Sequence, residues 1–299
     1  MTTAIGPDTR RDRAFEVAVL GDGKILIAGF ADMGPGAGRR NFMLARYKPN
    51  GSLDATFGSG GVVITRVAPA DNNDLVATNG MTIDSAGRIV LVGQANMGAG
   101  AGGVNSAVAR YNPDGSLDIS FDGDGIVTTA MAAGDDFDSF IAVATDSAGR
   151  IVAVGDAESG GLVFDWALAR YNPDGSLDGA FGSGGKVTTN VGPGNSDEDF
   201  EALVIQPTGT ILVGGSTAAT QVLVDSDFAL GRFNPDGTLD RTFGNGGIVT
   251  TNTAAGNGSD EIYEIALEND AKLVVSGECE QAGTGRDVCV ARYKIGDAD

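Results

Sequence analysis

Short segments in which apolar and polar residues alternate recur along the whole chain, and they predict β-strands. Residues 167–171, ALARY, alternate at the two-residue period of a strand. Between such segments stand turn sequences such as NPDG at 112–115, in which proline fixes φ and glycine accepts conformations that other residues resist. No segment has a convincing helical period. The pattern therefore predicts an all-β chain of short strands joined by tight turns.

One unit of this pattern occurs five times. The ten residues ARYNPDGSLD are identical at 109–118 and 169–178. Their arginine-aromatic pair recurs at intervals of 64, 60, 62 and 60 residues. The third strand of each unit is expected at 41–47, 105–111, 165–171, 227–233 and 287–293. The repeats fill residues 1–299 and predict a single domain.

Each unit contains four predicted strands, and four-stranded units repeated radially are typical of a β-propeller. We therefore predict a five-bladed propeller of four-stranded antiparallel blades. Residues 1–3 have the spacing of a fourth strand that no third strand precedes, whereas the last unit has a third strand without a fourth. The N-terminal strand is expected to complete the C-terminal blade and close the ring. A pair of β-sandwiches is the alternative, but it gives these complementary ends no role.

Units of the form ARYNPDGSLDxxFGxGGxVTT, followed by xxPDGKIxVxG, resemble the delta-60 repeat family of bacterial β-propeller-type proteins. The resemblance covers essentially the whole chain. It implies an exported or surface-associated module of uncharacterised role, and it transfers no catalytic residues. The first unit departs from the pattern with Lys48-Pro49-Asn50-Gly51, and the last unit ends before its turn and loop.

The charge balance narrows the range of partners. The chain has 20 basic and 40 acidic residues, a net charge of −20, which disfavours nucleic acid and anionic lipid. No stretch is long enough to span a membrane, and the N-terminus lacks the apolar core of a signal peptide. We expect a monomer, or part of a larger chain, that is extracellular or on the cell surface. The sequence has no histidine, the commonest general base and zinc ligand.

All length variation between the units falls in two connections, the loops between the second and third strands and the link into the second unit. These loops are expected at one face of the propeller, which would then differ from blade to blade while the turns at the other face stay the same. Insertions on one face of a repeat array commonly mark a binding face. The pattern thus predicts that this face binds a glycan or a surface protein.

An acidic residue stands just before each predicted first strand. These residues are Asp12, Asp74, Asp138, Glu198 and Asp260. On a propeller they would form a carboxylate ring near one mouth of the central channel, suited to a ligand, to Ca²⁺ or to acid–base chemistry on a sugar. The alternative is that each carboxylate caps its own loop or pairs with a nearby arginine. Recurrence in every blade favours this structural alternative.

Three further candidates remain. Asp118, Asp122 and Asp124 resemble half of a calcium loop, but the rest of that loop's ligands are absent and a solvated turn is the favoured alternative. Cys279 and Cys289, the only cysteines, are placed to form a disulfide across one hairpin, with two buried thiols as the alternative. The five repeated arginines could bind an anion, or pair between blades with acids such as Asp54, Asp118, Asp178 and Asp240, and the matched recurrence favours pairing.

Together these features predict a non-enzymatic binding or scaffold module with no certain cofactor and calcium as the candidate. One alternative is a carboxylate-based glycan-active enzyme in the central channel. The other is a purely structural repeat module.

Overall fold

The structure is a computed structural model, and it describes most of the chain in twelve stretches. These are residues 3, 5–6, 11–34, 40–68, 75–98, 103–131, 137–159, 163–192, 198–218, 226–253, 258–281 and 284–296. The loops predicted to vary between blades lie partly outside these stretches.

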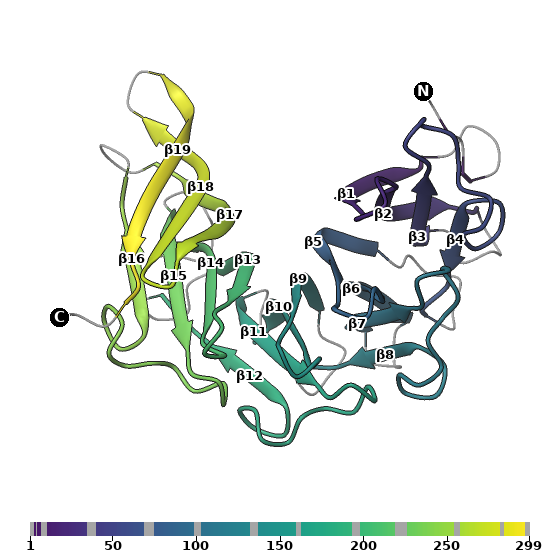
Figure 1. Ribbon diagram of the computed structural model, residues 1–299. Helices are drawn as coiled ribbons and strands as arrows, with labels where there is room; N and C mark the ends of the chain where they lie inside the picture. The colour runs from purple at the N-terminus through teal and green to yellow at the C-terminus, as the bar shows by residue number, and fades with distance from the viewer. Residues whose placement is uncertain are drawn as a thin grey trace. The chain divides into compact units, whose positions relative to one another are not determined.

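Five antiparallel sheets, which we call blades one to five, account for all the strands of the described residues (Figure 1). Blade one contains β1 (Arg13–Val19), β2 (Ile25–Asp32), β3 (Arg40–Tyr47) and β4 (Val62–Thr65). Blade two contains β5 (Leu75–Ile83), β6 (Ile89–Gly98), β7 (Gly103–Tyr111) and β8 (Ile126–Thr129). Blade three contains β9 (Asp138–Thr145), β10 (Ile151–Glu158), β11 (Phe164–Tyr171) and β12 (Lys186–Thr189). Blade four contains β13 (Glu198–Ile205), β14 (Ile211–Ala218), β15 (Ser226–Phe233) and β16 (Ile248–Thr251). Blade five contains β17 (Asp260–Asn269), β18 (Lys272–Gln281) and β19 (Gly285–Lys294).

Strands follow one another in chain order within each sheet, as in a meander. The all-β fold with four-stranded antiparallel sheets is confirmed, and the five sheets match the five predicted blades. No helix occurs among the described residues, so none of them provides a helix able to span a membrane. Most of the predicted closing strand lies outside the described residues, and Thr3 is not in a strand. Closure of the ring therefore stays a prediction.

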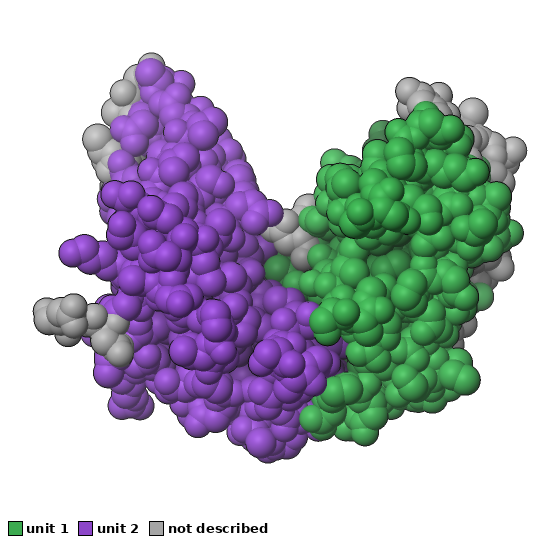
Figure 2. Space-filling view, in the orientation of Figure 1, with its two compact units in different colours: residues 1–143, 172–176 green, residues 144–171, 177–299 purple. Residues whose placement is uncertain are grey.

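The chain divides into two compact units (Figure 2). Unit 1 comprises Met1–Val143 and Asn172–Ser176, and unit 2 comprises Ala144–Tyr171 and Leu177–Asp299. The predicted single domain is not tested by this division.

Apolar side chains between neighbouring sheets form the core. In unit 1, Phe42 and Leu44 of β3 are fully buried in one cluster with Leu91 of β6 and Ala109 of β7. Alternate residues of a strand face opposite sides of its sheet. A strand in the middle of a sheet can therefore bury one set of its side chains on each face of that sheet. This explains why β3, β11 and β15 are buried along most of their length.

The first strands of blades one, four and five each contain a β-bulge. In β13 the bulge falls between Phe200 and Ala202, so Glu201 is the extra residue. The bulge brings the carbonyl oxygen of Asp199 within 2.0 Å of where a β-carbon would stand on Gly215 of β14. Only glycine fits so close an approach, and Gly29 and Gly277 occupy the same place in blades one and five. In these three blades the repeated glycine therefore permits the bulge, and the bulge directs one side chain.

Candidate functional site

The carboxylates of the predicted ring that the structure describes accept hydrogen bonds from backbone N–H groups of the loops that precede them. Asp12 accepts hydrogen bonds from the backbone N–H groups of Ile5 and Gly6, both at 2.9 Å. Asp138 accepts one from Met131 at 2.7 Å, and Glu198 accepts one from Gly192 at 2.8 Å. In each case the donor lies six or seven residues earlier in the chain.

Asp260 repeats this arrangement with the N–H of Thr253, at 2.7 Å. Asp138, Glu198 and Asp260 are almost completely buried. Asp74 lies outside the described residues. The described geometry is the loop-capping alternative, and a ligand role for these carboxylates stays a prediction.

The predicted calcium residues have separate partners. Asp118 accepts a hydrogen bond from Nε of Arg110 at 2.8 Å and a second from the Ser120 hydroxyl at 2.6 Å. Asp124 accepts one from the N–H of Ile126 at 2.9 Å. Within the described residues, no three acidic or cysteine side chains form a group able to hold a metal ion. A calcium site at Asp118, Asp122 and Asp124 stays a prediction that this geometry does not support.

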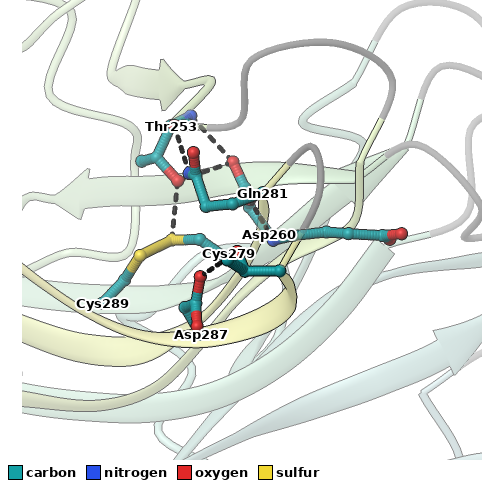
Figure 3. The surroundings of a disulfide bond; sticks show 8 residues. Thr253, Asp260, Cys279, Gln281, Asp287 and Cys289 are labelled. Atoms are coloured by element: carbon teal, nitrogen blue, oxygen red, sulfur yellow. Dashed lines mark hydrogen bonds between the residues drawn. A yellow bond between two sulfur atoms is a disulfide. The ribbon is translucent and has the colours of Figure 1, made fainter.

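Cys279 and Cys289 form a disulfide between β18 and β19, with an S–S distance of 2.06 Å (Figure 3). Cys279 is fully buried in the core between blades four and five. The Thr253 hydroxyl lies 2.6 Å from the Cys279 sulfur and 2.9 Å from Asp260. The disulfide therefore connects β19 to the loop that Asp260 holds.

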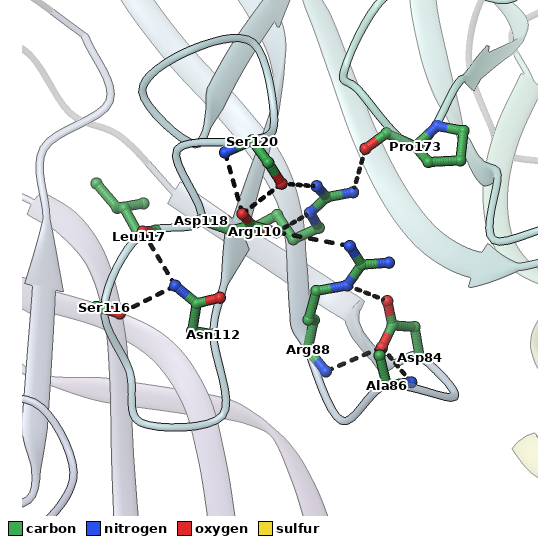
Figure 4. Close-up of polar contacts among 10 residues, drawn as sticks. All are labelled: Asp84, Ala86, Arg88, Arg110, Asn112, Ser116, Leu117, Asp118, Ser120 and Pro173. Atoms are coloured by element: carbon green, nitrogen blue, oxygen red, sulfur yellow. Dashed lines mark hydrogen bonds and ion pairs between the residues drawn. The ribbon is translucent and has the colours of Figure 1, made fainter.

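A buried arginine joins each of blades one to four to the blade that follows it. Arg110 of β7 donates from Nε to Asp118, from one terminal nitrogen to Ser120, and from the other to the carbonyl oxygen of Pro173 at 2.7 Å (Figure 4). Its guanidinium also lies 4.6 Å from the ring centre of Phe121. Burial alone would raise the pKa of Asp118, but the hydrogen bonds from Ser120 and the Arg110 charge outweigh burial and lower it.

We call this arrangement the arginine clasp. Equivalent clasps are made by Arg46 to Pro113, Arg170 to Pro235 and Arg232 to Ile295. The paired aspartates are Asp54, Asp178 and Asp240. Pairing with aspartates is therefore confirmed for these four arginines. The expected pairing between blades is wrong for them, because each aspartate belongs to the same blade as its arginine and the next blade contributes a carbonyl oxygen. Arg292 of β19 differs, because its side chain is 62% exposed and its ion pair is with Glu268 at 3.6 Å.

A cluster of acidic side chains on β13 and β17 breaks the repeat symmetry. The bulge in β13 presents Glu201, and the bulge in β17 presents Tyr263. The Tyr263 hydroxyl donates to Glu261 at 3.0 Å. We call Asp199, Glu201, Glu261, Tyr263 and Glu264 the inner acidic cluster; all of them belong to unit 2.

The inner acidic cluster contains a carboxyl group that titrates near neutral pH. Burial raises the pKa of Glu201 from 4.5 to about 7, and the charges of Asp199, Glu261 and Glu264 add to this rise. Burial also raises the pKa of Glu264, and burial together with the bond to Glu261 raises the pKa of Tyr263. A carboxyl group with a pKa near 7 can donate and accept a proton at neutral pH, as general acids and bases must.

Glu201 is not among the site residues predicted from the sequence, although a signal for it exists. Three residues after Asp12, Asp138 and Asp260 stand Phe15, Ile141 and Tyr263, which are all apolar or aromatic. The same offset from Glu198 gives Glu201. The predicted acidic residues recur in every unit, whereas the carboxyl group with the perturbed pKa is one that departs from the repeat.

The bulged sheets, the clasps and the five-fold repeat can be compared with known proteins. The model of one family, a β-propeller domain of unknown function (DUF5122), matches four segments of this chain. The matched segments are residues 20–57, 87–121, 149–181 and 206–243. Each runs from the turn between the first two strands to the loop phenylalanine of the clasp. No curated protein matches the chain.

Solved structures share the architecture at low sequence identity. A protein of unknown function from Dyadobacter fermentans is 14% identical with a TM-score of 0.55, and the alignment covers 94% of this chain and 75% of that protein. An ulvan lyase of polysaccharide lyase family PL25, bound to GlcA(1-4)Rha3S units, is 12% identical with a TM-score of 0.50. That alignment covers 93% of this chain and 70% of the lyase. At this identity the likeness shows the fold alone.

Proposed function

We propose that the chain is a non-enzymatic β-propeller module that binds a glycan or a surface protein through the loops between its second and third strands. The observation that supports this proposal is the arginine clasp. Four blades use an arginine, an aspartate and a main-chain carbonyl oxygen in the same contacts on the turn side of the sheets, which leaves little there to distinguish one ligand from another. Binding specificity is then expected where the blades differ, in the loops at the other side.

The proposal includes a closed five-bladed ring of delta-60 type. Blade five has three strands in the described residues, whereas blades one to four have four strands each. Residues 1–3 would supply the missing strand and leave no open sheet edge. Support comes from spacing, because Thr3 precedes Gly23 by the same 20 residues that separate Thr129 from Gly149.

We further propose that the protein works outside the cytosol, either exported or on the cell surface. The disulfide supports this, since disulfides persist in oxidising compartments and are rare elsewhere. The net charge of −20 disfavours nucleic acid as a partner.

Melting temperature across a panel of neutral and acidic oligosaccharides tests the binding role, with each measurement made in calcium and in EDTA. A ligand that binds only the folded protein must raise the melting temperature. We expect a rise with one glycan class, and loss of that rise when residues 219–225, between β14 and β15, are replaced by glycine and serine. A rise that EDTA removes would support the calcium candidates. No rise with any glycan would exclude a glycan ligand under these conditions and favour a protein partner or a scaffold.

A glycan-active enzyme is the second candidate, and the Glu201 carboxyl favours it. Glycosidases pair a carboxyl group of raised pKa with a second carboxylate, and the inner acidic cluster supplies both. The test is release of reducing sugar from a polysaccharide panel between pH 5 and 8, comparing the protein with Glu201→Gln. Activity that the substitution abolishes would support an enzyme. The absence of cleavage of every polysaccharide would leave the binding module as the better proposal.

A further inference from the structure

The outer edge of β19 differs from that of the other third strands, because β3, β7, β11 and β15 each pair with a fourth strand on that side. In the described residues β19 pairs with β18 only. We propose that the backbone of Val288–Ala291, which we call the acceptor edge, is a binding site for an extended polypeptide of the chain's own fourth-strand type, supplied by a separate peptide. This inference rests on the proposed closed ring, which assigns the same edge to residues 1–3, and extends it to a strand that binds in trans.

The register of the other blades identifies the edge. In each of blades one to four, a four-residue strand pairs antiparallel with the middle of the third strand. The paired segments of the third strands are Phe42–Ala45, Ser106–Ala109, Trp166–Ala169 and Phe228–Gly231. Counting from the repeated arginine, the equivalent segment of β19 is Val288–Ala291.

Backbone groups at this edge point the right way for a new strand. In blades one to four the N–H of the repeated arginine donates to the glycine that precedes the fourth strand, as Arg232 does to Gly247 at 2.9 Å. Hydrogen-bonding groups alternate along a strand. Val288, Val290 and Arg292 are therefore expected to direct their N–H and C=O groups toward the acceptor edge.

Two exposed valines show what the incoming strand would cover. Val288 and Val290 are 88% and 69% exposed, whereas Phe228 and Leu230, their equivalents in blade four, are each 1% exposed. In blade four, Val249 of the fourth strand lies opposite Leu230 and packs against the core. A valine at the second position of an added strand would lie opposite Val290 in the same way.

The disulfide holds the acceptor edge in place. Cys289 lies within the edge, and its bond to the buried Cys279 fixes β19 against β18. An ordered edge reduces the conformational entropy that a strand must overcome when it binds. The edge residues Val288, Cys289, Val290 and Ala291 carry no charge, which suits an uncharged β-branched strand.

These properties define the partner. Main-chain hydrogen bonds supply affinity in strand addition, and alternate side chains supply specificity. The chain's own fourth strands read VVIT, IVTT, KVTT and IVTT. The partner is therefore an extended segment with a β-branched aliphatic residue at its second position and threonine at its end.

The experiment uses a fluorescein-labelled peptide with the sequence of residues 246–252, GGIVTTN, and measures its anisotropy. It is titrated with the full chain and with a variant that lacks residues 1–3. We expect saturable binding to the truncated variant and none for a peptide of the same composition in scrambled order. Binding to the full chain should be about tenfold weaker or more, because a strand on the same chain competes at an effective concentration near millimolar. Hydrogen exchange should show new protection in residues 285–294.

A matched pair of valines gives the control. Val290→Asp should weaken peptide binding, whereas Val19→Asp, at a residue of similar exposure on β1, should not. Equal binding to the full and truncated chains would contradict the closed ring and leave the acceptor edge supported. Absence of binding to a truncated chain with a normal melting temperature would overturn the inference, as would protection at a sheet edge other than β19.

Discussion

The raised pKa of Glu201 predicts that part of the protein's stability is lost between pH 4.5 and pH 8. In the unfolded chain Glu201 ionises near its ordinary value of 4.5, whereas in the folded protein it stays protonated until about pH 7. Between these values the unfolded state has released a proton that the folded state still holds, so raising the pH favours unfolding. The contribution of the protonated Glu201 carboxyl group to the free energy of unfolding is fully present below pH 4.5, falls as the pH rises, and is absent once the pH has passed about 7.

The size of the effect follows from the shift. One pKa unit corresponds to about 1.4 kcal/mol, so a rise from 4.5 to about 7 corresponds to a loss of about 3 kcal/mol in the free energy of unfolding. Aspartates of lowered pKa in the clasps and turns act in the opposite direction, but at more acidic pH. The two effects therefore occupy different pH windows.

Urea unfolding at half-unit intervals from pH 4.5 to 8.5, followed by circular dichroism, measures this loss. Glu201→Gln should flatten the profile and make the protein more stable than the wild type above pH 7. Glu268→Gln, which removes a carboxyl on the exposed side of β17, should leave the profile unchanged. An unaltered slope in the Glu201→Gln protein would refute the reasoning, because the slope would then belong to other groups.

Three further changes test the fold. Arg110→Met should cost about 3 kcal/mol of unfolding free energy, since it removes the nearer charge partner of the buried Asp118 carboxylate and leaves only Arg88, at 3.7 Å. Restoration of most of this loss by adding Asp118→Asn would confirm the cause. Gly182→Ala should destabilise the protein more than Gly184→Ala. Both glycines have positive φ, but only at Gly182 would the new β-carbon meet a backbone oxygen, at 2.3 Å. Equal melting temperatures of the two variants would contradict this. Reduction of the disulfide should lower stability by about 3 kcal/mol in the wild type and not in a variant with alanine at both cysteines, as melting with and without dithiothreitol would show.

The sequence predicts most of the strands and contacts of a blade because the residues that make each contact recur at the same spacing in several units. The eight-residue interval from Arg110 to Asp118 recurs at Arg46 and Asp54, so pairing could be inferred before any geometry was known. The same recurrence favoured loop capping for Asp138. The third partner of each clasp was missed, because a carbonyl oxygen of the next blade has no residue type by which to recognise it.

The inner acidic cluster could not be predicted for a different reason. A one-residue bulge decides where the side chain of Glu201 points, and the bulge depends on the approach of Asp199 to Gly215 on the neighbouring strand. Strand alternation alone would place Glu201 with the wrong neighbours. Burial raises its pKa most, and the charges of Glu261 and Glu264, which lie 60 and 63 residues later in the chain, add to the rise.

The acceptor of every arginine clasp is a main-chain oxygen, and this has a consequence for how such proteins change over generations. Three prolines and one isoleucine provide this oxygen: Pro113, Pro173, Pro235 and Ile295. The clasp therefore does not depend on the side chain of the residue that accepts the hydrogen bond. A gene that duplicates one repeat encodes a new blade that can hold its successor and be held by its predecessor without any compensating mutation. Copy number can then vary by recombination, while substitutions accumulate in the loops that each copy carries.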